Sequence, residues 1–484
     1  MTQPNVVFIM SDQHQGKASG CYGHDFVRTP NIDSLAESGT LFSRAYTSSP
    51  ICTPARAALA TGQYIHRNEC WDNGHPYDGR PKSWHHMLRE HGVPTTSIGK
   101  LHFRSEADDT GFETQIIPMH AVEGVGELRG CIKRPMTKPM TASHVMTDIG
   151  PGDSPYIRYD LDIAERSCAW LRSQAAKPDG KPFVGFISFV CPHPPHLAPR
   201  EFYDIYARIR IPEPKAYAPE SPVHPWIALQ RNQQNYNDFV TPETWPVLMK
   251  SYYGCISYLD QNIGKVLKTL EETGLRNNTF VIYTSDHGEN LGARRMWGKC
   301  NMYEEASNIP MIISGPGIPP GETNLTPVTL IDVAPTMLDA MNLPGVAEAN
   351  NLPGISMIEL AKTGGNPERV AFTEYYAAGA ETAAFMLRRG KFKYIHYVDF
   401  EPELFDLDTD PEELANLCSD PAYRNRIQEF EAILRGIVDP EAVNEAAYLS
   451  QCRKVAAAGG REAIIARGKY QVSPPPGEPI VWVP

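Results

Sequence analysis

The chain has 484 residues and a mass of 53.9 kDa, more than one hydrophobic core usually supports, so we expect two domains and at most about three. With 42% hydrophobic and 21% charged residues it has an ordinary globular composition, which excludes collagen, a coiled coil and a disordered chain. The net charge of −12 disfavours nucleic acid and anionic membrane surfaces as partners.

The first residues and the cysteines predict a cytoplasmic protein. The apolar run from Val6 to Met10 is short and lacks a preceding basic segment, so we expect no signal peptide. No window approaches the ~20 apolar residues of a membrane span. Ten cysteines are scattered without a CxxC pair, which predicts free thiols in a reducing compartment and no zinc cluster.

Continuous apolar runs predict strands that are buried on both faces. The runs are Asn5 to Ser11, Phe183 to Val190 and Thr279 to Thr284. Between the last two, apolar residues recur at helical spacing from Ile256 to Leu270, and Gly274 is a usual terminator. Strands that alternate with helices predict an α/β fold, in which sites form beyond the carboxyl ends of the strands.

The last part of the chain predicts a smaller domain with an antiparallel sheet and a helix. Three short candidate strands follow one another without long helices, and one face of a later helix carries Ile427, Phe430 and Leu434. The segment Lys362 to Pro367 is a plausible linker. The candidate strands are Val370 to Tyr376, Ala383 to Leu387 and Lys391 to Tyr397.

We therefore divide the chain into a catalytic α/β domain (1–365), a C-terminal α+β domain (366–468) and a Pro-rich arm (469–484). The segment Ser473 to Pro479 cannot form regular structure, yet Ile480 to Val483 is too apolar for a solvated tail. We expect the arm to pack against another surface, with a second subunit as one candidate.

One short segment carries a reactive group. Thr53 suits a helix cap, Pro54 suits the first helical position and Gly62 suits the end, which predicts a helix with Cys52 at its N-terminus. Backbone N–H groups and the helix dipole stabilise anions there, and Arg56 lies about one turn further on. Considered alone, Cys52 would be interpreted as a small apolar core residue.

The neighbouring motifs change that interpretation. Cys52-Thr53-Pro54-Ala55-Arg56 resembles the C-x-P-x-R motif of sulfatases, and similar segments occur in family order over roughly residues 5 to 417. The resemblance implies the alkaline phosphatase-like fold, with a large, mixed, mostly parallel sheet flanked by helices. It also implies that a formylglycine-generating enzyme converts Cys52 to formylglycine, which Arg56 holds in place. The other segments are Arg28 to Asp33, Ser285 to Glu289, Gly298 to Glu304 and Glu403 to Leu407.

Two pairs of polar residues at strand ends predict a metal site. Asp12-Gln13 and Asp286-His287 bring oxygen ligands, which suit Ca²⁺, Mg²⁺ or Mn²⁺, and the modified Cys52 would be a further ligand. In many sulfatases the similar places carry Asp-Asp and Asp-Asn, whereas this chain has Asp-Gln and Asp-His. The nitrogen of His287 makes Mn²⁺ a rival to Ca²⁺ as the one divalent metal.

Further side chains match the family's active-site segments. Gly99-Lys100-Leu101-His102 is similar to the sulfatase G-K-x-H, and alternation along an extended segment would point Lys100 and His102 at one site. His193 matches the histidine of the H-x-P segment, whereas we expect His196 to be structural or part of the pocket wall. Otherwise these would be a solvated lysine and core histidines.

Two more residues are candidates for substrate binding, together with Lys100 and His193. Lys299, in Gly298-Lys299-Cys300, matches the family's active-site lysine and would otherwise be a surface lysine. Asn73 belongs to an Asn-Gly turn, which explains it equally well.

The resemblance implies hydrolysis of a sulfate monoester. The hydrated formylglycine at residue 52 attacks sulfur, and the metal, Lys100 and Lys299 neutralise the transferring group. His193, with Lys299, protonates the departing alcohol, and His102 then takes a proton so that sulfate is released. The alternatives are a phosphonate monoester or phosphodiester hydrolase with the same machinery, whose members carry hydroxyl side chains at Lys100 and His102, and a non-catalytic binding protein.

The leaving group stays undefined at this level. The loops Gly124 to Met146 and Pro212 to Glu243 would form the pocket wall, so aryl, choline and sugar sulfates all remain candidates. We expect a small-molecule sulfate ester as substrate and a homo-oligomer, dimer or tetramer, as an open alternative to a monomer.

Overall fold

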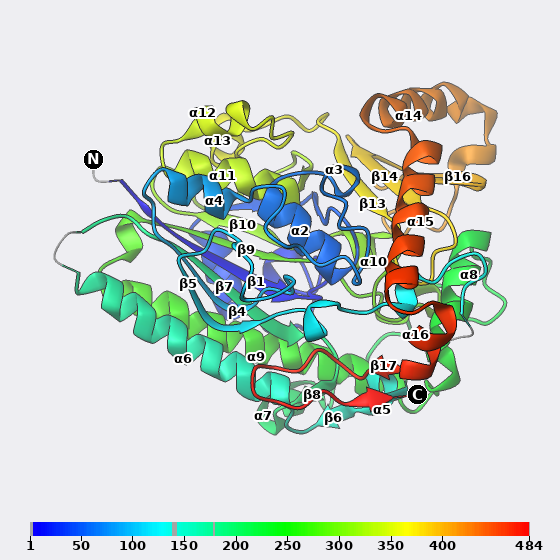
Figure 1. The fold of residues 1–484 in the computed structure, drawn as a ribbon, viewed down its shortest axis with the longest axis horizontal. Coiled ribbons are helices and arrows are strands. Elements are labelled where there is room, and N and C mark those ends of the chain that lie inside the picture. Colours follow the sequence, from blue (N-terminus) through cyan, green and yellow to red (C-terminus); the bar gives the residue numbers. More distant parts are fainter. Residues whose placement is uncertain (1–2, 138–142, 178–179, 484) are drawn as a thin grey trace.

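An eight-stranded sheet forms the centre of the computed structural model, which describes residues 3–137, 143–177 and 180–483 (Figure 1). All strand pairs in it are parallel except those that β10 makes with β2 and β9. This confirms the predicted mixed, mostly parallel α/β sheet. In spatial order the strands are β11 (Glu322–Asn324), β2 (Thr40–Phe42), β10 (Met311–Ser314), β9 (Thr279–Ser285), β1 (Asn5–Asp12), β7 (Val184–Pro192), β4 (Thr95–Lys100) and β5 (Thr114–Met119).

The three predicted apolar runs form the middle of the sheet, where β1 lies between β9 and β7. Every residue of β1 is buried. Successive side chains of a strand point to opposite faces, so Val6, Phe8 and Met10 join one hydrophobic cluster while Val7 and Ile9 join another. The continuous apolar runs therefore follow from burial on both faces.

Helices cover both faces of this sheet, as Figure 1 shows. The long helix α9 is the one predicted from helical spacing, and beyond it Gly274 has φ +73°, which suits glycine. One layer contains α2 (Cys52–Thr61), α4 (Trp84–Glu90), α11 (Val333–Ala340) and α13 (Met357–Thr363). The other layer contains α1 (Pro30–Glu37), α6 (Pro155–Ala175) and α9 (Trp245–Glu272).

The C-terminal part contains an antiparallel sheet of four strands. Three of them confirm the predicted strands, and the helix α14 (Arg424–Ile437) confirms the predicted one. The fourth strand, β16, was not predicted because proline and acidic residues interrupt its apolar pattern. Tyr46 and Tyr303 of the large part share a hydrophobic cluster with this sheet. The strands are β13 (Ala371–Tyr375), β14 (Ala384–Arg389), β15 (Phe392–Tyr397) and β16 (Phe400–Asp406).

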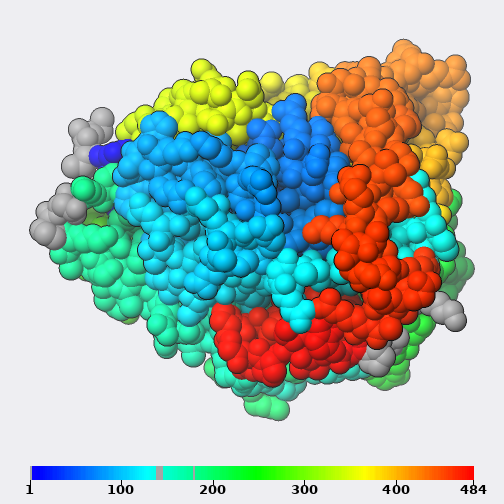
Figure 2. All heavy atoms as spheres, in the orientation of Figure 1, coloured from blue at the N-terminus to red at the C-terminus, as the bar shows by residue number. Residues whose placement is uncertain are grey.

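The C-terminal arm packs on its own chain, which Figure 2 shows in red across one face of the molecule. Its two short strands, β17 (Lys469–Tyr470) and β18 (Trp482–Val483), pair with each other. The chain reaches them through α15 (Pro440–Ala457) and α16 (Arg461–Arg467). Val472 contacts one of the two main clusters. Contact of the arm with a second subunit stays a prediction.

The remaining strands and helices connect these layers. All ten cysteines are free. Over the residues that the structure describes, no helix is both long and apolar enough to cross a bilayer. The connecting elements are β3 (Ala45–Tyr46), α3 (Ile65–Asn68), α5 (Ser143–Thr147), β6 (Ile149–Pro151), β8 (His196–Ala198), α7 (Arg200–Tyr206), α8 (Pro225–Gln234), α10 (Glu304–Ser307), β12 (Val328–Thr329) and α12 (Pro344–Ala349).

The central position of β7 predicts a large cost for creating a cavity in it. Ile187 is fully buried between β1 and β4, so Ile187→Ala should lower the free energy of unfolding by about 3 kcal/mol. Urea denaturation followed by circular dichroism measures this. The matched control is Ile205→Ala on α7, whose side chain is 42% exposed and whose loss should change little. Equal effects of the two substitutions would contradict the described core.

Candidate active site

The register of the sheet brings the predicted strand-end residues together. Ser11 of β1 pairs with Ser285 of β9, so Asp12 and Asp286 follow at the same level of neighbouring strands. On the other side Asp12 pairs with Pro192 of β7, which His193 follows. Lys100 is the last residue of β4, the next strand along. One edge of the sheet therefore carries residues from four separate motifs.

Cys52 reaches this edge from the first turn of α2. The helix begins at Cys52 itself, so the predicted cap at Thr53 and first helical position at Pro54 were wrong by two residues. The N-cap residue is Ile51, which has no capping side chain. Instead, Asn73 Oδ1 accepts a hydrogen bond from the Thr53 N–H at 3.1 Å, which a local sequence pattern cannot show.

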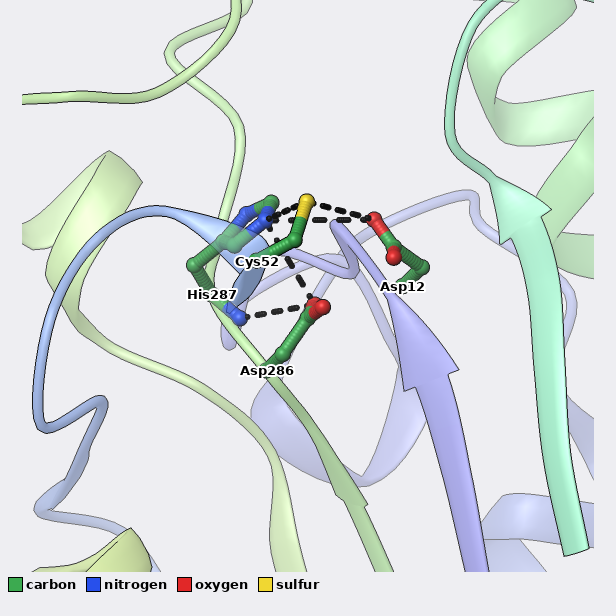
Figure 3. A group of neighbouring side chains, drawn as sticks. All are labelled: Asp12, Cys52, Asp286 and His287. Carbon is green, nitrogen blue, oxygen red and sulfur yellow. Dashed lines mark hydrogen bonds and ion pairs between the residues drawn. The ribbon is translucent and has the colours of Figure 1, made fainter. Parts of the chain in front are cut away.

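Four potential ligand groups converge at this edge of the sheet, namely the thiol of Cys52 and the side chains of Asp12, Asp286 and His287 (Figure 3). Cys52 Sγ lies 3.1 Å from His287 Nε2 and 3.7 Å from Asp12 Oδ1. His287 Nε2 is also 3.6 Å from Asp286 Oδ1 and 3.8 Å from Asp12 Oδ1. All four side chains are buried, and their ligand atoms lie within 4.8 Å of one another.

The protonation of His287 is fixed by its second nitrogen. Nδ1 lies 3.0 Å from the carbonyl oxygen of Gly288, which can only accept, so Nδ1 carries the proton. Burial lowers the pKa of His287 to about 4, so the imidazole is neutral and the lone pair of Nε2 can accept a hydrogen bond from the Cys52 thiol or bind a cation. This lone pair faces the carboxylates of Asp12 and Asp286, an arrangement of acceptors that suits a cation between them.

Arg56 holds the two carboxylates in position. Its Nε donates to Asp286 Oδ2 at 2.9 Å and its second terminal nitrogen donates to Asp12 Oδ2 at 3.2 Å. The remaining terminal nitrogen donates to the Lys100 carbonyl and to Ser188 Oγ, both at 2.9 Å. Arg56 is 1% exposed, so this network is fully enclosed by protein.

Lys299 and Gln13 form the opposite side of the cluster. Lys299 Nζ is 3.2 Å from Cys52 Sγ and donates to Gln13 Oε1 at 2.7 Å. The Gln13 amide nitrogen donates to buried Glu289, which orients Oε1 toward the site. Burial alone would lower the pKa of Lys299, but Cys52 and the carboxylates of Asp12 and Asp286 raise it, so the ammonium is retained.

Lys100 and His102 both face the pocket, although not in the way predicted. Lys100 Nζ lies 2.5 Å from Asp12 Oδ2, and both side chains are buried. Burial raises the pKa of Asp12, but the charges of Lys100 and Arg56 hold it well below its ordinary value. The strand ends at Lys100 and His102 has φ +56°, so the prediction of an extended segment was wrong.

A cavity adjoins Cys52 and is lined by most of the other predicted residues. His193, Asn73, Lys100, His102 and Lys299 line it, whereas His196 does not. The two predicted wall loops contribute as well, although residues 138–142 of the first lie outside the described residues. Lining residues outside the predicted loops and motifs include Tyr156, Lys469, Tyr470 and Ser473.

His193 is neutral in the free protein. Its Nδ1 lies 2.8 Å from the Pro194 carbonyl oxygen and therefore carries the proton. Burial, reinforced by Lys299, holds the pKa of His193 well below its ordinary value. Nε2 is then a hydrogen-bond acceptor, and a negative charge in the cavity would favour its protonation.

A second group of potential ligands, Asp72, His75 and Cys131, is a hydrogen-bonded structural network. Asp72 accepts from His75, from the Gly74 N–H and from Gln451 at 2.7 to 2.8 Å. Its carboxylate is thus satisfied by the chain, and it holds the turn that carries Asn73.

Comparisons with known proteins identify the family of this chain. Residues 4–343 match the family model described as "Sulfatase", and residues 292–438 match "N-sulphoglucosamine sulphohydrolase, C-terminal". The chain is 32% identical to the choline-sulfatase of Rhizobium meliloti (strain 1021), over 93% of this chain and 90% of that protein. It is 29% identical to arylsulfatase K of Danio rerio, over 92% and 86%.

Among solved structures, the phosphonate monoester hydrolase of Agrobacterium radiobacter is similar, with a TM-score of 0.73 and 26% identity. The match covers 90% of this chain and 95% of that one. The chain belongs to the sulfatase family, as its motifs indicated.

The enclosed Arg56 network predicts a strong dependence of stability on this residue. Arg56→Met should lower the free energy of unfolding by about 3 kcal/mol or more, because two carboxylates lose their shared buried partner. Urea denaturation provides the measurement. The control is Arg89→Met, whose partner Asp109 is 65% exposed, and it should cost less than about 1 kcal/mol. A smaller loss for Arg56→Met than for the control would contradict the network.

Proposed function

We propose that this chain hydrolyses sulfate monoesters at Cys52 and releases sulfate and an alcohol or phenol. The observation that carries the proposal is the position of Cys52 Sγ, 3.2 Å from the Lys299 ammonium and within 4 Å of Asp12 and His287. A nucleophile thus lies beside both a cation-binding cluster and a fixed positive charge. The names of the two relatives make choline and aryl sulfates the first esters to test.

The chain's own residues fit a divalent cation. Asp12, Asp286 and His287 Nε2 would hold it, with Gln13 Oε1 as a further donor, and the mixed donor set suits Ca²⁺ with Mn²⁺ as rival. Formylglycine generated from Cys52 would supply a hydrated aldehyde as nucleophile, and the cation would lower the pKa of its hydroxyl. A formylglycine-generating enzyme is the implied partner.

Lys100 and Lys299 would stabilise the charge of the transferring group. Both line the cavity beside Cys52, and each ammonium is held by a fixed contact, with Asp12 or with Gln13. Such fixed charges need no reorganisation during reaction, which is the source of their effect on the transition state.

Two histidines would move protons. His193 Nε2 accepts a proton more readily once an anionic ester lies beside it, and it can then return this proton to the departing alkoxide. His102 Nδ1 is buried without a hydrogen-bond partner among the described residues and lines the cavity. It is the candidate base for the step that releases sulfate.

A phosphonate monoester hydrolase is the second candidate. The similarity to the Agrobacterium radiobacter enzyme over 90% of this chain favours it. Lys100 and His102 favour the sulfatase, since we expect hydroxyl side chains at these places in phosphonate hydrolases.

Removal of the nucleophile tests the proposed reaction. Cys52→Ala should retain less than about a hundredth of the turnover of 4-nitrophenyl sulfate, because alanine supplies no nucleophile. Cys300→Ala is a matched control, since Cys300 is also buried and lines the same cavity without approaching the ligand cluster. It should retain most of the activity. A Cys52→Ala protein with a tenth of wild-type turnover would refute the proposal.

Loss of one ligand tests the metal site. Asp286→Asn should weaken Ca²⁺ and Mn²⁺ binding by ~10-fold or more in calorimetric titration, because it removes one of two carboxylate charges. Asp72→Asn, in the hydrogen-bonded network, should leave the affinity unchanged. Equal loss in both variants would assign the effect to general destabilisation, and unaltered binding by Asp286→Asn would disprove the site.

A further inference from the structure

The C-terminal arm contacts a residue of the active-site cavity directly. Ser473 Oγ lies 2.9 Å from His102 Nε2, although 371 positions separate them in the chain. Residues 469–473 line the same cavity as Cys52 and Lys100. Figure 2 shows the arm as a continuous strip across the surface of the catalytic part.

We infer that the arm forms one wall of this chain's own active site and that Ser473 is a positioning residue for His102. In this arrangement Ser473 Oγ accepts the Nε2–H bond and leaves Nδ1 unprotonated toward the cavity. The role of His102 as a base rests on the proposed function, whereas the contact between Ser473 and His102 does not depend on it.

Two observations together favour this tautomer. Nδ1 of His102 is buried and has no partner in the described parts of the chain, and an unpaired buried N–H is rarer than an unpaired acceptor. Burial, reinforced by the charges of Lys100 and Arg56, holds the pKa of His102 well below its ordinary value, so the ring is neutral and carries a single proton.

The arm is anchored on both sides of Ser473. Tyr156, which also lines the cavity, donates its hydroxyl to the Ser473 carbonyl at 2.7 Å. The Gln471 N–H donates to the Val481 carbonyl at 2.7 Å, and the β17–β18 pair closes the arm on itself. Ser473 is 6% exposed. A hydroxyl held this firmly can fix the orientation of the imidazole.

The experiment compares Ser473→Ala with Ser473→Thr, which retains the hydroxyl, and with Glu478→Gln on an exposed part of the arm. We expect Ser473→Ala to lower kcat for 4-nitrophenyl sulfate ~10-fold with KM changed less than ~2-fold, since loss of an orienting partner typically costs this much. Ser473→Thr should recover most of kcat, and Glu478→Gln should match the wild type. Equal kcat for Ser473→Ala and wild type would overturn the inference.

A second readout does not depend on activity. In protein labelled with ¹⁵N-histidine, the His102 signals, assigned by their loss in His102→Ala, should show a single neutral tautomer with the proton on Nε2. Ser473→Ala should give a mixture of tautomers. A single unchanged tautomer in Ser473→Ala would refute the positioning role, whatever the activity of the wild type. Absence of sulfatase activity in the wild type would refute only the proposed function.

Mixing two inactive proteins tests whether the wall belongs to the same chain. A protein that lacks residues 469–484 supplies Cys52 but no arm, and Cys52→Ala supplies the arm alone. We expect the mixture to stay as inactive as its parts. Restored turnover would show that the arm is exchanged between copies and would overturn the assignment to one chain.

Discussion

The buried contact of Arg56 with Asp12 and Asp286 is the interaction on which the site depends. Asp12 is the last residue of β1, Asp286 directly follows the neighbouring strand β9, and Arg56 comes from the first turns of the helix that carries Cys52. The guanidinium therefore fixes the distance between the nucleophile and the cluster of ligands. The planar, forked guanidinium suits this role, because it donates hydrogen bonds to both carboxylates and to a strand carbonyl at once.

The charges around Cys52 suit an anionic ester. Two carboxylates, Asp12 and Asp286, face three cationic side chains, Arg56, Lys100 and Lys299. This group is positive by one charge before any divalent cation binds. A negatively charged sulfate ester is therefore attracted, and the burial of Asp12, Asp286, Arg56 and Lys100 strengthens the interactions among these charges.

Local sequence patterns predicted those parts of the fold that depend on the burial of neighbouring residues along the chain. Burial of β1, β7 and β9 on both faces produces apolar runs, so these strands were recognised, and their register explains why the carboxylates meet. β16 has no such pattern. The helix start at Cys52 depends on Asn73, a partner distant in sequence, and was placed two residues late.

The site residues that the sequence did not indicate make their contacts with residues far away in the chain. Ser188 could have been noticed as a polar residue in a buried strand, where it accepts from Arg56. Ser473 gave no signal, because nothing in a proline-rich arm indicates that one hydroxyl meets His102 across the fold. The loops of the pocket wall were predicted, but the contribution of the terminal arm to this wall becomes visible only in three dimensions.

The most direct test of the central claim is the relative kcat/KM of the wild type for 4-nitrophenyl sulfate and for a phosphonate monoester of the same phenol. The cavity, with Lys100 and His102 beside Cys52, predicts that the sulfate ester is preferred. Preference for the phosphonate would contradict the account and would favour the phosphonate monoester hydrolase instead.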